Sequence, residues 1–247
     1  NIPQSLTAFN SNGFSVGADP DGSSNTGWNP SSGAMVAWQW KAGGSPVSNT
    51  SGSIASQVSA NQSAGFSVVT YTAPSSGAFT VGHGLGVAPA FIVTKSISNA
   101  YSWGAYHQSL GNTGRLDLNS TNAFVTTQNS AWNNTSPTST VFSMGLDWAG
   151  SGITYVAYCF AEVSGYSKFG SFTGNGSTDG AFVYCGFRPK FLLIKTNAEA
   201  GDWQLWDSSR GSYNVNGADL YPNSSAAEAT VNAFDFLSNG FKMRFAA

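Results

Sequence analysis

The sequence repeats itself at a spacing of one hundred residues, and this duplication limits the possible folds more than any other feature. The segment from Pro89 to Lys95 aligns without a gap with the segment from Pro189 to Lys195. Further identities hold the same offset, namely Trp103 with Trp203, Ser109 with Ser209 and Gly111 with Gly211. Chance would not keep one offset across several rare residue types. Each copy is therefore expected to be one structural unit.

Part of a third copy precedes the two full ones. Residues 9–14 (Phe-Asn-Ser-Asn-Gly-Phe) resemble residues 236–241, and residues 35–40 resemble residues 155–160. Between this fragment and the first full copy lies a stretch rich in Gly, Ser, Asn and Gln, which is either a linker or a loop-and-strand segment. The expected organisation is the C-terminal part of a first repeat plus linker in 1–64, a first full repeat in 65–164, and a second repeat lacking its last strand in 165–247.

Alternation of apolar and polar residues dominates the sequence. Residues 66–72, 91–93, 155–160 and 191–194 are short β-branched or aromatic runs bounded by Gly, Pro, Asn and Ser, which predicts strands. Parallel architecture is disfavoured because the sequence offers no helices for the crossover connections. The prediction is an all-β chain of tandem antiparallel β-sandwiches, jelly-roll-like, with about 100 residues in each repeat.

Composition narrows the function. Charged residues make up 9% and hydrophobic residues 41% of the 247 residues, with a formal net charge of -2, so the chain is expected to fold rather than remain disordered. The ten basic residues are scattered singly, which disfavours nucleic acid and membrane partners. Cys159 and Cys185 lie in apolar runs and are expected to be free thiols, which suits assembly in a reducing cytoplasm; one bridge between them is the alternative.

No group of residues points to catalysis or to a cofactor. His83 lies in a Gly-rich turn without the lysine of a phosphate-binding loop, and His107 is replaced by Asp207 in the second copy. The few acidic residues form no pattern that selects an acid and a nucleophile for glycoside cleavage. We therefore expect no catalytic, cofactor-binding or metal-binding residue, and no enzyme activity.

The eight tryptophans are more informative, because an exposed aromatic face flanked by amides suits a sugar ring. Trp103 and Trp203 recur at equivalent positions next to strands, which favours a shared role in the core. Trp132 and Trp148 have no counterpart in the second copy. These two are the predicted contacts for a glycan or a protein partner, and they are expected to be more exposed than the repeated pair.

Three motifs resemble a repeated domain in virion proteins of tailed bacteriophages, notably marine and cyanobacterial ones, where it occurs in tail-fibre-like chains. They are Gly82–Pro89, Thr154–Glu162 and Gly165–Gly176. The resemblance covers nearly the whole chain. It implies a non-enzymatic virion surface protein, as a tail fibre, an appendage or a head decoration. Such a protein would be assembled in the host cytoplasm from copies of itself or with other virion proteins, and could bind a host glycan.

Two rival functions remain. A carbohydrate-binding module of a secreted protein is the main alternative, and a polysaccharide depolymerase is the weakest. Binding to a glycan array without release of sugar would separate binding from hydrolysis.

The family generally continues past Asn-Gly-Phe-Lys with a strand of the Tyr-Val-Ala-Tyr type, which the second copy lacks in this sequence. The N-terminal fragment carries a spare version of that strand, formed by Met35, Val36, Ala37, Trp38, Gln39 and Trp40. A sandwich without one strand exposes unpaired backbone groups, which favours addition of a strand. The spare strand is therefore expected to complete the last sheet, within one chain or between neighbours. The alternative is that the sequence is a fragment.

Overall fold

The structure, a computed structural model, describes residues 6–17, 35–126, 131–211 and 213–245. The chain forms two compact units, Asn1–Trp40 and Lys41–Ala247. In the first unit, strands β1 (Leu6–Asn10) and β2 (Gly13–Val16) form an antiparallel hairpin. A two-residue turn joins them, a connection whose twist matches that of paired strands.

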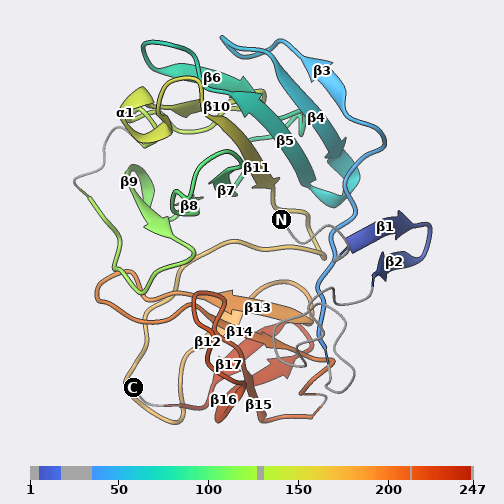
Figure 1. The fold of residues 1–247 in the computed structure, drawn as a ribbon. Helices are drawn as coiled ribbons and strands as arrows, with labels where there is room; N and C mark the ends of the chain where they lie inside the picture. The colour runs from blue at the N-terminus through green and yellow to red at the C-terminus, as the bar shows by residue number, and fades with distance from the viewer. Residues whose placement is uncertain (1–5, 18–34, 127–130, 212, 246–247) are drawn as a thin grey trace. The chain divides into compact units, whose positions relative to one another are not determined.

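A seven-stranded antiparallel sheet is the largest element of the second unit (Figure 1). Its strands, in spatial order, are β3 (Val47–Asn49), β4 (Ser56–Asn61), β5 (Phe66–Thr72), β11 (Thr154–Phe160), β7 (Phe91–Ser96), β8 (Gly104–His107) and β9 (Gly111–Asp117). The strands predicted over 66–72, 91–93 and 155–160 are confirmed. Residues 43–64 are a loop-and-strand segment, because they supply β3, β4 and the 3-10 turn η1 (Gln62–Ala64).

A two-stranded sheet lies against one face of the large sheet. It pairs β6 (Phe79–Gly82) with β10 (Val141–Met144), and the short helix α1 (Leu146–Ala149) follows β10. Alternation along β11 shows how the core forms, because Tyr155, Ala157 and Cys159 are at most 1% exposed and fill the space between these two sheets. The intervening residues of β11 point to the opposite face.

The second copy forms two further sheets. One is the antiparallel pair of β13 (Phe191–Ile194) and β14 (Gln204–Asp207). The other has four strands, in the order β12 (Phe182–Tyr184), β17 (Gly240–Met243), β16 (Ala229–Leu237) and β15 (Asn216–Asp219). The strand predicted over 191–194 is confirmed.

The sheets of the second unit stack in four layers, with one apolar cluster in each gap. The first cluster lies between the β6–β10 pair and the seven-stranded sheet, and the second lies between that sheet and the β13–β14 pair. The third fills the space between the β13–β14 pair and the four-stranded sheet; β13 and β14 are drawn in orange in Figure 1. Two inner layers are therefore covered on both faces, which explains the unbroken apolar run Phe191–Ile194.

The predicted all-β, antiparallel architecture is confirmed, and the copies share details beyond their strands. The backbone N–H of Trp103 donates to Asn119 Oδ1 at 2.9 Å, and the N–H of Trp203 donates to Asn223 Oδ1 at 2.7 Å. Both tryptophans contact the second apolar cluster, but Trp203 is buried there and Trp103 is only partly buried. A second hydrogen bond is also repeated, and its acceptor is the residue after each repeated proline. The N–H of Gln108 donates to the carbonyl O of Ala90 at 2.8 Å, and the N–H of Ser208 donates to the carbonyl O of Lys190 at 3.0 Å.

Strand registers also match between copies. Phe142 lies opposite Val81 in the β10–β6 pair, and Phe241 lies opposite Val183 in the β17–β12 pair. The hairpins β1–β2 and β16–β17 agree in the same way, since each places two phenylalanines opposite one another beside a two-residue turn. These correspondences allow a feature of one copy to be compared residue by residue with the other.

Candidate functional site

His83 has a structural role. Its side chain is buried, its Nδ1 accepts a hydrogen bond from the N–H of Leu85 at 3.2 Å, and its Nε2 lies 3.1 Å from the carbonyl O of Thr138. Because Nδ1 is the acceptor, Nε2 carries the proton and donates to Thr138. Burial lowers the pKa of His83. The neutral ring thus ties the turn after β6 to the segment before β10.

His107 and its replacement Asp207 perform the same local task. Nδ1 of His107 accepts from the N–H of Ser109 at 3.2 Å, and Oδ1 of Asp207 accepts from the N–H of Ser209 at 2.9 Å. Burial lowers the pKa of His107. Both side chains therefore close an equivalent turn. Among the described residues, no three His, Cys, Asp or Glu side chains come together as a set that could hold a metal ion.

Trp132 is not on the surface, and the prediction of its exposure is wrong. Its side chain is 1% exposed and packs in the first apolar cluster, with its ring edge-on to Tyr106 at a centroid distance of 5.6 Å. The polar neighbours in the sequence suggested a surface loop. In the structure, residues 131 and 132 turn inward beside β10. Trp132 therefore cannot touch a glycan or a partner without unfolding of this segment.

Trp148 is partly buried rather than displayed. The guanidinium of Arg115 lies over its ring at 3.9 Å from the centroid, and Nε of Arg115 donates to Asp117 at 2.9 Å. The edge of the indole also lies against Gly104 of β8, where an added Cβ would meet it at 2.8 Å. One face of Trp148 is thus already occupied by a cation–π contact, which leaves less of the ring for a sugar.

Both cysteines are free thiols. Cys159 is buried in β11, and burial raises its pKa to about 12, so its thiol stays protonated and unreactive.

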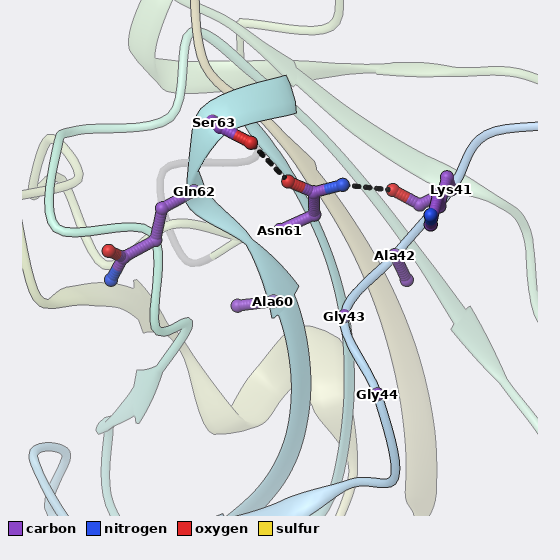
Figure 2. Close-up of a pocket in the computed structure, with 8 residues that line it drawn as sticks. All are labelled: Lys41, Ala42, Gly43, Gly44, Ala60, Asn61, Gln62 and Ser63. Carbon is purple, nitrogen blue, oxygen red and sulfur yellow. Dashed lines mark hydrogen bonds between the residues drawn. The ribbon is translucent and has the colours of Figure 1, made fainter.

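A shallow groove lies between residues 41–44 and the end of β4, and Figure 2 shows its lining. Nδ2 of Asn61 donates to the carbonyl O of Lys41 at 3.1 Å, and Oγ of Ser63 donates to Oδ1 of Asn61 at 2.8 Å. The backbone of Gly43 approaches that of Ala60 so closely that a Cβ would overlap it. The amide of Asn61 thus holds the segment 41–44 against the end of β4.

The interior of the second copy is less well covered than that of the first. Ile92 and Thr94 of β7 are 0% and 1% exposed, whereas their counterparts Leu192 and Ile194 of β13 are only partly buried. In the first copy, β7 is paired on one side with β8 and on the other with β11. In residues 41–126, 131–211 and 213–245, β14 is the one strand that pairs with β13. Among these residues, no strand takes beside β13 the place that β11 takes beside β7.

Strand β12 has an open edge among the described residues. In the first copy, the equivalent edge of β6 is covered, because Ile54 donates its N–H to Thr80 O at 3.4 Å and Thr80 exchanges backbone-to-hydroxyl bonds with Ser53. Within the described residues, β12 pairs with β17 alone. Its outward side chains, Phe182 and Tyr184, are 47% and 66% exposed.

Sequence reasoning missed this aromatic edge. The register places Phe182 and Tyr184 at the positions of Thr80 and Gly82 in the first copy. Two aromatic residues thus replace a threonine and a glycine. A comparison of the two copies with their strands aligned could have found this difference. We define the open side of the second copy as the edge of β12 that pairs with no strand among the described residues, with its exposed side chains Phe182 and Tyr184.

Residues 35–40, predicted as a complementing strand, have no regular secondary structure here. Met35 and Val36 are 61% and 39% exposed. Pairing of this segment with the last sheet stays a prediction.

Comparison with curated proteins and with solved structures found no match. No helix among the described residues is long and apolar enough to cross a membrane. A comparison with protein families matches residues 1–247 to DUF7483, a domain of unknown function. Since the match extends over the whole sequence, the chain is a member of the DUF7483 family.

Proposed function

We propose that the protein is a non-enzymatic structural component of a phage virion surface, where it assembles with copies of itself through its β-domains. The observation that carries the proposal is the open side of the second copy. An uncovered strand edge presents unpaired backbone donors and acceptors, and native proteins usually cover or charge such an edge. Here β12 carries no charge at its centre but two exposed aromatic side chains, Phe182 and Tyr184.

The virion setting is supported by the resemblance of three motifs to tail-fibre-like proteins. Low charge suits the same role, because contacts between hydroxyls, amides and aromatic rings lose little when salt screens ion pairs over about 10 Å. Tail fibre, appendage and head decoration all fit these properties.

Analytical ultracentrifugation over a wide concentration range tests the proposal. We expect the chain to self-associate, and we expect Phe182→Lys to weaken the association by placing a charge on the β12 edge. Tyr166→Lys is the matched control, because Tyr166 is 59% exposed but lies outside the open side. A chain that stays monomeric throughout, or an equal effect of the two substitutions, would overturn the assignment.

A carbohydrate-binding module is the alternative, favoured by the exposure of Tyr184 and by that of Tyr213, whose side chain is 85% exposed. Such rings can stack on a sugar. Glycan-array binding by a monomeric chain, lost in Tyr184→Ala or Tyr213→Ala, would support this alternative over assembly.

A further inference from the structure

Two residues of β12 direct their backbone groups to the open edge. Met243 of β17 donates its N–H to the carbonyl O of Ala181 at 3.1 Å, so Ala181 faces β17. Alternate residues of a paired strand direct their backbone groups to the same side, and Val183 therefore faces β17 as well. The N–H and C=O groups of Phe182 and Tyr184 face away from β17, where they make no hydrogen bond to a described residue.

The side chains on this edge do not suit the cover that the first copy uses. There, the amide of Asn49 lies so close to Gly82 that a Cβ on the glycine would overlap it. Tyr184 stands at the position of Gly82 in the second copy. A segment placed like that around Asn49 would meet the side chain of Tyr184 instead of a bare glycine. The edge of β12 is suited instead to a strand that presents aromatic side chains of its own, because aromatic cross-strand pairs stabilise a sheet.

We propose that β12 of a second molecule covers this edge, so that the two β12 strands pair antiparallel across a two-fold axis at Val183. This inference rests on the proposed function, since it names the strand through which molecules assemble. In this register Val183 lies opposite Val183 of the second molecule, and Phe182 lies opposite its Tyr184. The two four-stranded sheets then form one continuous sheet.

The register uses the outward backbone groups of both strands. Directly opposite residues of antiparallel strands exchange N–H···O bonds in both directions when their backbone groups point toward one another. Phe182 of one molecule and Tyr184 of the other meet this condition, and the two-fold axis repeats the pair. A shift by one residue would set outward groups against inward ones. A shift by two would set one ring of each strand opposite a glycine, Gly180 or Gly186.

The side chains of β12 fit the same pairing. The exposed rings of Phe182 and Tyr184 would lie beside one another on one face of the joined sheet, where aromatic pairs are favourable. The ring of Phe182 already rests over Gly240 of β17, since a Cβ on that glycine would lie 3.0 Å from it. Val183 packs against the third apolar cluster, and Val183 of the second molecule would extend that cluster.

The charges at the two ends of β12 are complementary under a two-fold axis. Asp179 precedes the strand with 81% of its side chain exposed, and Lys242 lies 2.5 Å from it. Arg188 follows the strand and is exposed. Antiparallel pairing sets the start of one β12 beside the end of the other, so Asp179 of one molecule and Arg188 of the other lie at the same end. Such a contact is isologous and closes at two molecules.

Proline on the open edge gives the first test. Tyr184→Pro and Tyr184→Ala both remove the ring, but only proline removes the N–H that points to the edge. Proline is tolerated on an edge strand where its nitrogen faces solvent, so the two variants should have similar Tm values. By symmetry, the proline removes half of the hydrogen bonds between the strands. We expect sedimentation to show a monomer–dimer equilibrium for the parent, and an association constant at least about tenfold lower for Tyr184→Pro than for Tyr184→Ala.

Cysteine pairs test the register, and they do so even if the proline disturbs folding. In a background with Cys185→Ser, one chain carries Phe182→Cys and another carries Tyr184→Cys. Directly opposite residues of paired strands lie within the reach of a disulfide. We expect mixing and mild oxidation to give a covalent dimer. Either variant alone is the matched control and should give little, because its two cysteines lie two residues out of register.

The outcomes separate this pairing from the proposed function. If Phe182→Lys weakens association but Tyr184→Pro and Tyr184→Ala associate equally well, the molecules meet at this edge without pairing of strands, and the proposed function alone stands. If either cysteine variant alone forms covalent dimers as readily as the mixture, the two-fold register is wrong. If the parent stays monomeric at every concentration, both proposals fail.

Discussion

Trp203 joins the two copies, and its replacement measures how firmly they are held together. Its side chain is 4% exposed in the gap between the seven-stranded sheet and the β13–β14 pair, and its Nε1 donates to the carbonyl O of Asp117 at 3.0 Å. Trp203→Phe removes that hydrogen bond, which is worth about 1 kcal/mol. It also leaves unfilled volume that costs about 1 kcal/mol more. The expected loss is therefore about 2 kcal/mol.

For a chain of this length, such a loss lowers Tm by about 4–8 °C. Differential scanning calorimetry and urea denaturation measure it, and Trp103→Phe is the control. Trp103 is only partly buried and contributes its backbone N–H to Asn119, so its replacement should cost less than half as much. Trp203→Phe with an unchanged Tm, or equal losses for both variants, would refute the argument that the Trp203 indole holds the layers together.

Three further results are expected from stability measurements. Burial lowers the pKa of His83, so the unfolded chain binds a proton at this side chain more tightly than the folded chain does. The free energy of unfolding should therefore fall as the pH drops below about 6.5, and His83→Gln should reduce that dependence. Burial raises the pKa of Asp219 to about 6 from 3.8. Its contribution to the free energy of unfolding is therefore favourable below pH about 4 and is lost as the pH rises through about 6, and Asp219→Asn should remove this loss. Gly82→Ala places a Cβ against the amide of Asn49 and should cost about 1–3 kcal/mol in urea denaturation, whereas Gly44→Ala, with open space around it, should cost little.

Strand positions could be predicted from the sequence because alternation is a local property. The runs at 66–72, 155–160 and 191–194 coincide with β5, β11 and β13. Trp132 shows the limit of the same reasoning, because amide and hydroxyl neighbours along the chain do not reveal that a segment turns into the core. The open side of the second copy was also beyond local reasoning. An edge is defined by which strands are absent beside it, and that depends on the pairing of segments far apart in the sequence.

The layered arrangement couples the open side to the contact between copies. The layer of β13 and β14 contributes to two apolar clusters. Leu193, and Trp203 just before β14, lie on the side of the first copy, whereas Leu192 and Trp206 lie on the side of the four-stranded sheet. A packed layer transmits strain because it has few voids into which side chains can relax. A partner bound at the β12 edge would restrain the four-stranded sheet, and the inward side chains of β13 and β14 pack against that sheet. The free energy of assembly and the stability of the contact between the copies are therefore expected to depend on one another, because free-energy changes at neighbouring packed groups are not additive.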